Sequence, residues 1–253
     1  MSLLSLNQLS VTRGGCPVVD AVTLTVGPGE CVGLIGPNGA GKTTLMRAAI
    51  GLLPRAGGTS NLAALPAGDR ARQVAWMPQS REIAWPVTVE TLIALGRIPH
   101  LPRGARLRDE DRFAIDAAIA RMGLETFRTR RATELSGGEQ ARVLIARALA
   151  QDTALVMADE PIAGLDPASQ IATMDVFSSL ATEGHAVVVS LHDLGLAARH
   201  CTRLLMLHQG RVVADGPPAE VLTDDRMATV FNVTAYHAQT PSGAVFQPLE
   251  VVR

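Results

Sequence analysis

The chain has 253 residues, which is enough for one large domain or two small ones. Hydrophobic residues make up 47% but aromatic residues only 3%, so the core must be built from aliphatic side chains, as in α/β proteins. The formal net charge of −1 offers no electrostatic footprint for nucleic acid, and apolar runs such as residues 154–158 are too short to span a membrane. We therefore expect a soluble chain without a nucleic-acid partner, whose membrane role, if any, comes through another protein.

The amino-terminal part carries strand patterns. Residues 3–11 and 18–26 alternate apolar with polar side chains, and Arg13-Gly14-Gly15 between them is typical of a turn, so this part predicts an antiparallel β-hairpin. Residues 30–35 form a continuous apolar run that predicts a buried strand ending in a glycine-rich loop. Residues 42–51 then predict a helix.

The middle of the chain is mainly helical in pattern. Gly57-Gly58 predicts a turn and residues 73–77 a short strand, after which the pattern from about 87 to 150 indicates helices. Acidic residues at 109–111 open one of these helices. Three apolar residues share one face of that helix: Ile115, Ile119 and Met122.

Strand and helix patterns alternate again in the carboxyl-terminal part. The predicted strands cover residues 154–158, 185–190 and 203–207, and the predicted helices cover residues 167–180 and 194–200. Such alternation implies a parallel sheet with helices on its faces, hence the α/β class. We expect a single domain over residues 1–253, with a core (about 1–79 and 151–253) interrupted by a helical insertion (about 80–150).

A phosphate-binding loop carries the first chemical motif. Residues 36–43 match GxxxxGK[ST] and lie between a predicted strand and a predicted helix, the context in which the pattern is informative. The glycines let backbone N–H groups turn around a β-phosphate, Lys42 would reach the β- and γ-phosphates, and the Thr43 hydroxyl would ligate Mg²⁺. Lys42 is also the one lysine among 23 basic residues, consistent with a site that encloses a phosphate too closely for arginine. The predicted nucleotide-binding residues of this loop are Gly36, Pro37, Asn38, Gly39, Ala40, Gly41, Lys42, Thr43 and Thr44.

Two carboxylates, Asp159 and Glu160, end the apolar strand predicted at 154–158. Placed beside the phosphate-loop strand in a parallel sheet, this strand would bring both carboxylates to the edge where ligands bind. Asp159 would then hold the Mg²⁺ shell, and Glu160 would polarise the attacking water as general base. The expected ligands are therefore ATP and Mg²⁺.

The sequence Leu135-Ser136-Gly137-Gly138-Glu139-Gln140 resembles the signature of ATP-binding-cassette (ABC) ATPases, and it precedes Asp159-Glu160 at the separation seen in that family. Ser136 can cap a helix that starts at Gly137, which leaves a helix N-terminus and two glycines open to a phosphate. The resemblance implies a P-loop NTPase core (a RecA-like parallel sheet with helices) with an N-terminal antiparallel β subdomain and an inserted α-helical subdomain.

Three further elements resemble the same family in the same order. Gln79 resembles the Q-loop glutamine that contacts the metal and the attacking water, residues 164–166 resemble the D-loop, and His192 resembles the switch histidine that touches the γ-phosphate. The resemblance implies two subunits packed head to tail, with each ATP held between the phosphate loop of one subunit and the signature of the other. The residues implied to act within one subunit are Lys42, Thr43, Gln79, Asp159, Glu160 and His192, and those implied to act from the other subunit are Ser136, Gly137 and Gly138.

Arg13 stands where the family commonly has an aromatic residue that stacks on adenine. A guanidinium plane can stack on a base, so Arg13 either takes that place or is a solvated hairpin residue. Ala141 and Ile162 also depart from residues that are frequent in the family. Neither departure removes a phosphate or metal ligand.

The segment after Gln79 carries a narrower resemblance. Residues 86–90 and 95–100 resemble the helical insertion of ATPases that power uptake of iron–siderophore, haem and cobalamin complexes. This implies integral-membrane permease subunits and, indirectly, a substrate-binding protein as partners, at the cytoplasmic face of the inner membrane. The alternatives are the ATPase of another ABC importer or exporter, a soluble ABC ATPase outside transport, or a regulatory module that does not hydrolyse. Loss of Glu160 or His192 would indicate the last, and both are present.

Overall fold

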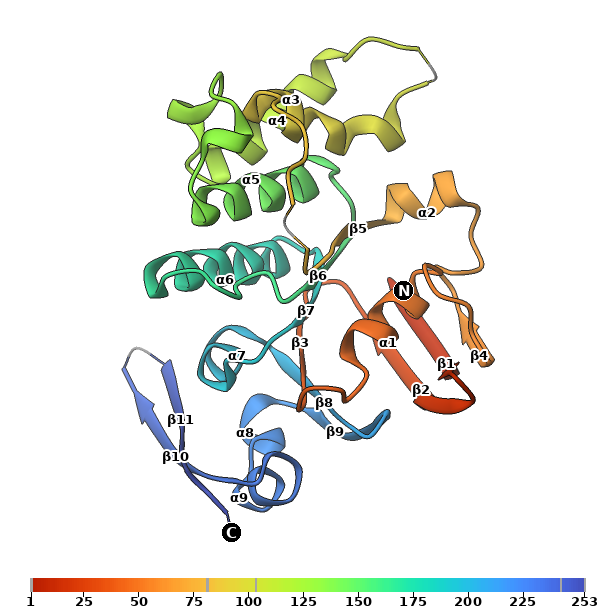
Figure 1. Ribbon diagram of the computed structural model, residues 1–253, viewed down its shortest axis with the longest axis vertical. Helices are drawn as coiled ribbons and strands as arrows, with labels where there is room; N and C mark the ends of the chain where they lie inside the picture. The colour runs from red at the N-terminus through yellow and green to blue at the C-terminus, as the bar shows by residue number, and fades with distance from the viewer. Residues whose placement is uncertain (1, 81, 103, 242, 253) are drawn as a thin grey trace.

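A six-stranded sheet lies at the centre of the computed structural model, which describes residues 2–80, 82–102, 104–241 and 243–252 (Figure 1). The strand order is β5-β6-β7-β3-β8-β9, in which the first five strands are parallel and β9 is antiparallel to β8. The strands are β3 (Cys31–Ile35), β5 (Val74–Met77), β6 (Leu155–Asp159), β7 (Ala186–Ser190), β8 (Arg203–His208) and β9 (Arg211–Gly216). The predicted parallel α/β sheet is confirmed.

The sheet is apolar on both faces because each central strand is fully buried. Every residue of β3, β6 and β7 is buried, and successive side chains point to opposite faces. One face packs with the N-terminal β-sheet and with α1 (Lys42–Ala49). The other face packs with α6 (Pro167–Thr182), α7 (Leu194–His200) and the helices inserted between β5 and β6. Two hydrophobic layers therefore hold the phosphate-loop strand between them.

The N-terminal sheet has the strand order β2-β1-β4 and is antiparallel. Its strands are β1 (Leu4–Arg13), β2 (Cys16–Val26) and β4 (Gly57–Ser60). The predicted hairpin is confirmed, but the turn predicted at Gly57-Gly58 is wrong, because both residues lie in a strand. Gly58 has a φ of 72°, and a Cβ there would overlap the carbonyl of Gln8. The glycine permits close approach of β4 to β1.

The helices between β5 and β6 stack at the top of Figure 1. They are α3 (Val89–Ala94), the 3₁₀ helix η1 (Leu95–His100), α4 (Asp109–Arg121), the short 3₁₀ turns η2 (Glu125–Phe127) and η3 (Ala132–Glu134), and α5 (Gly137–Ala150). We call this set the helical insertion; α2 (Ala67–Gln73) precedes β5. Ile115, Ile119 and Met122 are buried in one cluster with residues of α5, as their shared face predicted.

The strand order corrects one expectation. β6 does not lie beside the phosphate-loop strand β3, because β7 lies between them and pairs with both. The all-apolar run of β7 suits this central position, where both neighbours and both faces exclude water. All three strands run parallel, so Asp159 of β6 and Ser190 of β7 still reach the edge at which β3 ends.

The carboxyl-terminal part adds elements that the sequence patterns did not predict. They are α8 (Pro218–Val221), α9 (Asp224–Arg226), a π-helical turn (Met227–Phe231) and the antiparallel pair β10 (Val233–Thr240) and β11 (Gly243–Val251). Phe246 of β11 is buried in the same cluster as α7, which docks this hairpin on the core. Within the described residues, no helix combines the length and apolarity needed to cross a membrane.

Replacing Gly58 by alanine should lower the free energy of unfolding by about 2–4 kcal/mol, because the left-handed backbone is strained and the added Cβ overlaps the Gln8 carbonyl. Gly57→Ala is the matched control, since its Cβ would only reach ordinary contact with Ser10, at 3.9 Å. Urea unfolding followed by circular dichroism measures both. Equal stability of the two variants would contradict this account of β4.

Candidate active site

The phosphate loop connects the end of β3 to α1 and is shaped by its neighbours. Gly41 is the N-cap of α1 in the left-handed region (φ 102°), and a Cβ there would lie 2.6 Å from the carbonyl oxygen of Val18. A Cβ at Gly36 would overlap the carbonyl of Leu207. Backbone carbonyl groups of β2 and β8 thus lie too close to the loop for a side chain, and only glycine fits at these two positions. The loop is fixed in shape by backbone contacts.

Lys42 begins α1 and turns its side chain back over the loop. Its Nζ donates to the carbonyl oxygens of Gly36 at 2.7 Å and Pro37 at 3.3 Å, and the residue is 6% exposed. Burial lowers the pKa of the ammonium group, while the nearby Glu160 and Asp159 carboxylates act in the opposite direction. The loop therefore encloses a cation that is poorly solvated, a good partner for an anionic group.

Asp159 and Thr43 meet at the end of the loop. The Thr43 hydroxyl lies 3.2 Å from Asp159 Oδ1, and the Ser190 hydroxyl donates to the same oxygen at 2.7 Å. Asp159 is 1% exposed, yet its Oδ2 has no hydrogen-bond partner. A buried carboxylate oxygen without a partner is costly unless a cation or donor completes it.

These oxygens fit Mg²⁺, which prefers hard oxygen ligands and keeps several waters or phosphate oxygens in its shell. Asp159 Oδ2 and the Thr43 hydroxyl are protein oxygens that would hold it, and the contact of Gln79 with the metal stays a prediction. Among the described residues, no group of three or more His, Cys, Asp and Glu side chains could hold a metal ion by itself. An ion here would therefore depend on water and nucleotide phosphates for its other ligands.

Glu160 follows Asp159 and is held at several points. Its Oε2 accepts from Gln79 Nε2 at 2.8 Å, and its Oε1 lies 2.6 Å from His192 Nε2. Its backbone N–H donates to Ser190 Oγ at 2.8 Å, and its φ is 50°, a left-handed value that is unusual outside glycine. A non-glycine residue held in such a conformation is typical of functional sites. The structure thus brings three predicted catalytic side chains together: Gln79, Glu160 and His192.

Sequence analysis missed Ser190. This fully buried hydroxyl binds Asp159 Oδ1 and the backbone N–H of Glu160, so it sets the spacing of the two carboxylate residues. The available signal was a serine at the end of one predicted apolar strand, which the structure pairs directly with Asp159 at the end of another. The signal was ambiguous because it depends on β6 and β7 being neighbours.

Ser136 caps α5 as predicted, but it lies away from the phosphate loop of its own chain. Its hydroxyl accepts from the backbone N–H of Glu139 at 3.4 Å, and Glu139 reaches back to the Ser136 N–H at 2.8 Å, which together form a capping box. The Ser136 N–H holds the pKa of the Glu139 carboxyl below its usual value. In Figure 1, α5 lies among the upper helices and α1 lies below, beside the N-terminal sheet.

Three predicted nucleotide-binding residues lie outside the groups described so far: Arg13, Gly137 and Gly138. Arg13 is the exposed last residue of β1, opposite Cys16, and its stacking on adenine stays a prediction. A Cβ added at Gly137 would meet no atom within 4 Å, whereas one at Gly138 would meet Leu165 at 4.0 Å. The helix N-terminus after Ser136 is therefore open to solvent on one side.

Comparisons with known proteins identify the family of the chain. The family model described as ABC transporter matches residues 19–163, more than half of the chain. The hemin import ATP-binding protein HmuV of Rhodococcus jostii is 42% identical over 230 residues, which cover 88% of this chain and 77% of that protein. The cobalamin import ATP-binding protein BtuD of Halobacterium salinarum is 41% identical over 249 residues, 96% of this chain. This chain spans 62% of the length of that relative.

A solved structure of a metal-chelate type ABC transporter in an inward-facing conformation resembles the whole fold. It has a TM-score of 0.86 and 23% sequence identity, and the match covers 99% of this chain and 98% of that chain. At this identity the likeness establishes the fold, including the helical insertion and the carboxyl-terminal elements within the matched region.

Replacing Ser190 by alanine should lower the free energy of unfolding by about 1–3 kcal/mol, because the buried Asp159 carboxylate and the Glu160 N–H each lose a partner. Ser178→Ala is the control, since its hydroxyl makes one part-buried hydrogen bond to the His200 carbonyl, at 2.9 Å, and should cost under about 1 kcal/mol. Chemical unfolding at neutral pH measures the difference. A Ser190 variant as stable as the control would contradict this bridging role.

Proposed function

This chain is a member of the ABC transporter family, and from that premise we propose that it is an ATPase subunit that binds and hydrolyses ATP to power transport. The observation that carries the proposal is the arrangement of Glu160 between Gln79 and His192, directly beside the Thr43–Asp159 pair. The proposed general base, Glu160, then lies next to the residue pair that would bind Mg²⁺, where the phosphate loop meets α1. We further propose that residues 1–253 form one nucleotide-binding domain, with a core over about 1–79 and 151–253 and an insertion over about 80–150.

Nucleotide binding is assigned to the phosphate loop. The glycine-bearing loop would direct backbone N–H groups at the β-phosphate, and the N-terminus of α1 adds the positive end of its dipole. Lys42 would exchange its hydrogen bonds to the Gly36 and Pro37 carbonyls for phosphate oxygens. The exchange is favourable because an ion pair in this buried site replaces contacts with neutral carbonyls. Asn38, Ala40 and Thr44 complete the loop.

Hydrolysis is assigned to Glu160, which would accept a proton from the attacking water. Its carboxylate is bonded to Gln79 and His192, so one of these contacts must yield for water to approach. Gln79 would then orient the water and His192 would reach the γ-phosphate. When bound, Mg²⁺ supplies charge neutralisation on the phosphate oxygens. Asp159 and Thr43 would hold it, and Ser190 keeps Asp159 in place.

The complete site is proposed to form between two copies of the chain packed head to tail. Two features support this. The capped N-terminus of α5 is exposed, and it lies away from the phosphate loop of its own chain. A second copy would bring Ser136, Gly137 and Gly138 to the γ-phosphate, where the open helix N-terminus suits an anion. ATP would then act as the contact between subunits.

The proposed cargo is an iron–siderophore, haem or cobalamin complex. The support is the identity of 41–42% to proteins named for cobalamin and hemin import, together with the match to a metal-chelate type transporter. Integral-membrane permease subunits would bind the chain at the cytoplasmic face of the inner membrane, and a substrate-binding protein would act indirectly. Copurification with the permease encoded beside its gene tests this assignment. Copurification with an exporter subunit would contradict it.

Glu160→Gln should keep ATP binding yet slow hydrolysis by on the order of 10²–10⁴-fold, because the amide cannot accept the proton from water. The variant should also accumulate as a dimer with ATP in size-exclusion chromatography. Glu90→Gln is the matched control, because this exposed carboxylate pairs with Arg128 at 3.8 Å, away from the assigned site, and the variant should hydrolyse ATP at the wild-type rate. A Glu160 variant with wild-type turnover would place the base elsewhere.

Mixing two inactive variants tests the shared site. In a mixed dimer of Lys42→Ala and Ser136→Arg subunits, one site carries both defects and the other carries neither, so phosphate release should recover. The expected rate is roughly half that of wild type if the two sites act independently. Each variant alone must first be shown inactive, and mixed dimers must be isolated by differential tags. Mixed dimers without activity would contradict the head-to-tail arrangement.

A further inference from the structure

The carboxyl-terminal end of α5 poses a hydrogen-bonding problem. The last carbonyls of a helix lack partners within it. Here the backbone N–H groups of Gln151 and Asp152 satisfy the carbonyls of Ala148 at 3.3 Å and Leu149 at 2.9 Å. The carbonyls of Ala150 and Gln151 still need donors from elsewhere in the chain.

The 3₁₀ helix η1 supplies these donors. Arg97 Nη1 donates to the Ala150 carbonyl at 2.9 Å, and His100 Nε2 lies 2.7 Å from the Gln151 carbonyl, to which it would donate. Gly96 lets η1 approach, because a Cβ there would overlap the Arg147 carbonyl. A cation at this end also suits the negative end of the helix dipole. Three residues of one short segment thus close the end of α5, and we call them the η1 clamp.

Arg97 is held rigidly while it does this. It is 5% exposed, and its Nε donates to Asp111 Oδ1 of α4 at 3.0 Å. Asp111 has no exposed surface, and the backbone N–H of Arg108 binds its other oxygen at 3.0 Å and holds the pKa of its carboxyl below the usual value. A buried ion pair adds little to stability by itself. Because the guanidinium group is planar, however, the bond from Nε to Asp111 fixes the orientation in which Nη1 meets the Ala150 carbonyl.

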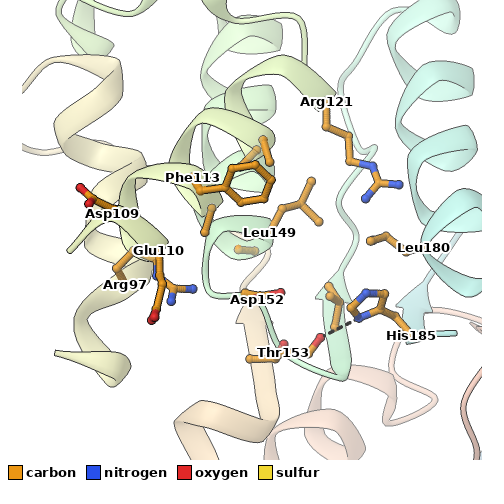
Figure 2. A pocket seen from close by; sticks show the side chains of 15 residues that line it. Arg97, Asp109, Glu110, Phe113, Arg121, Leu149, Asp152, Thr153, Leu180 and His185 are labelled. Carbon is orange, nitrogen blue, oxygen red and sulfur yellow. Dashed lines mark hydrogen bonds between the residues drawn. The ribbon is translucent and has the colours of Figure 1, made fainter. Parts of the chain in front are cut away.

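A second support comes from Gln151, just beyond α5, whose side-chain Nε2 donates to the carbonyls of Ala71 at 2.6 Å and Val74 at 3.0 Å. The side of this end that faces α6 borders a pocket instead. This half-open pocket of about 630 Å³ is lined by Ala148 and Leu149 of α5 and by Leu180 and His185 of the core. Figure 2 shows Arg97 on one side of this pocket and His185 and Arg121 across it. Arg121 of α4 donates to Ser179 of α6 and to Glu183 just after that helix, and these bonds join α4 to the core. Within the described residues, the η1 clamp and Gln151 therefore both hold the end of α5, and the clamp is the support that also joins this end to Asp111 of α4.

We infer that the η1 clamp positions α5 so that Ser136, at its other end, meets the nucleotide held by the partner subunit. The inference rests on the proposed composite site and adds positioning residues to it. With 14 residues, α5 is about 21 Å long at 1.5 Å per residue, so a tilt of about 10° at the clamp would displace Ser136 by roughly 4 Å. Misplacement of about 1 Å can cost on the order of 10²-fold in rate.

Two independent variants test the clamp. Gly96→Ala forces η1 away from α5 without changing any charge. Arg97→Met combined with Asp111→Asn removes the bond to Ala150 without leaving an unpaired buried charge. Each homodimer should hydrolyse ATP roughly 10- to 100-fold more slowly than wild type, while the Kd for ATP stays within about twofold. Arg131→Met is the matched control, because its ion pair with Glu134 is exposed, and it should hydrolyse at the wild-type rate.

The discriminating measurement is a mixed dimer with Lys42→Ala subunits. If the clamp acts through Ser136, both defects fall in one site, and activity should recover to the level of the Lys42→Ala and Ser136→Arg mixture. If the clamp instead affects the nucleotide site of its own chain, neither site is intact and the mixture hydrolyses ATP no faster than the clamp variant alone, which would overturn the inference. Wild-type rates in both clamp variants, or loss of fold in both by circular dichroism, would also overturn it. Failure of the Lys42→Ala and Ser136→Arg mixture itself would instead mark failure of the proposed function.

Discussion

The site depends on one buried hydroxyl between two parallel strands. Ser190 ends β7, donates to the carboxylate of Asp159 at the end of β6, and accepts from the N–H of Glu160. Because β7 also pairs with β3, the same residue relates the two acidic residues to the phosphate loop. A charged group that is 1% exposed persists only with such support. The register of β6, β7 and β3 therefore determines where Asp159 and Glu160 lie relative to the phosphate loop.

The two hydrophobic layers pack on opposite faces of the central sheet, and each supports a different part of the site. The layer containing α1 and the N-terminal sheet braces the phosphate loop, and the layer containing α6 and α7 joins the sheet to the helical insertion. Alternate residues of β3 belong to the two layers, so neither can shift without disturbing the strand that carries the loop. The strand that carries the phosphate loop therefore packs against both the N-terminal sheet and the layer that includes the helical insertion.

Much of the fold and site could be predicted from the sequence because the relevant patterns are local. The apolar runs of β3, β6 and β7, the glycine-rich loop and the capping box at Ser136 each lie within a few residues. Ser190 was missed because its contacts span 30 and 31 residues and require the strand order. The same limit caused the misplacement of β6 beside β3. Gly58 was misread because a glycine that permits close strand approach looks, in sequence, like a glycine in a turn.

The carboxyl-terminal hairpin escaped prediction for a different reason. Of the residues in β11, only Phe246 is buried, so the alternation that marks a half-buried strand is missing. The η1 clamp was seen in sequence only as part of a resemblance. Its residues bind carbonyl groups about 50 positions away, and backbone acceptors leave no trace in the side-chain sequence.

The chain contains a single lysine, Lys42, which makes lysine-directed chemistry specific for the phosphate loop. Lys42 carries the one side-chain ε-amino group of the 253-residue sequence, and it is buried in the loop that encloses it. Reagents that acylate or reductively alkylate lysine therefore have one side-chain target in the whole chain. Because burial lowers the pKa of that amine, a larger fraction of it is in the neutral, reactive form at a given pH than for a free lysine. Modification detected on the peptide that contains Lys42 therefore reports the accessibility of the phosphate loop, separately from any reaction at the α-amino group of the chain.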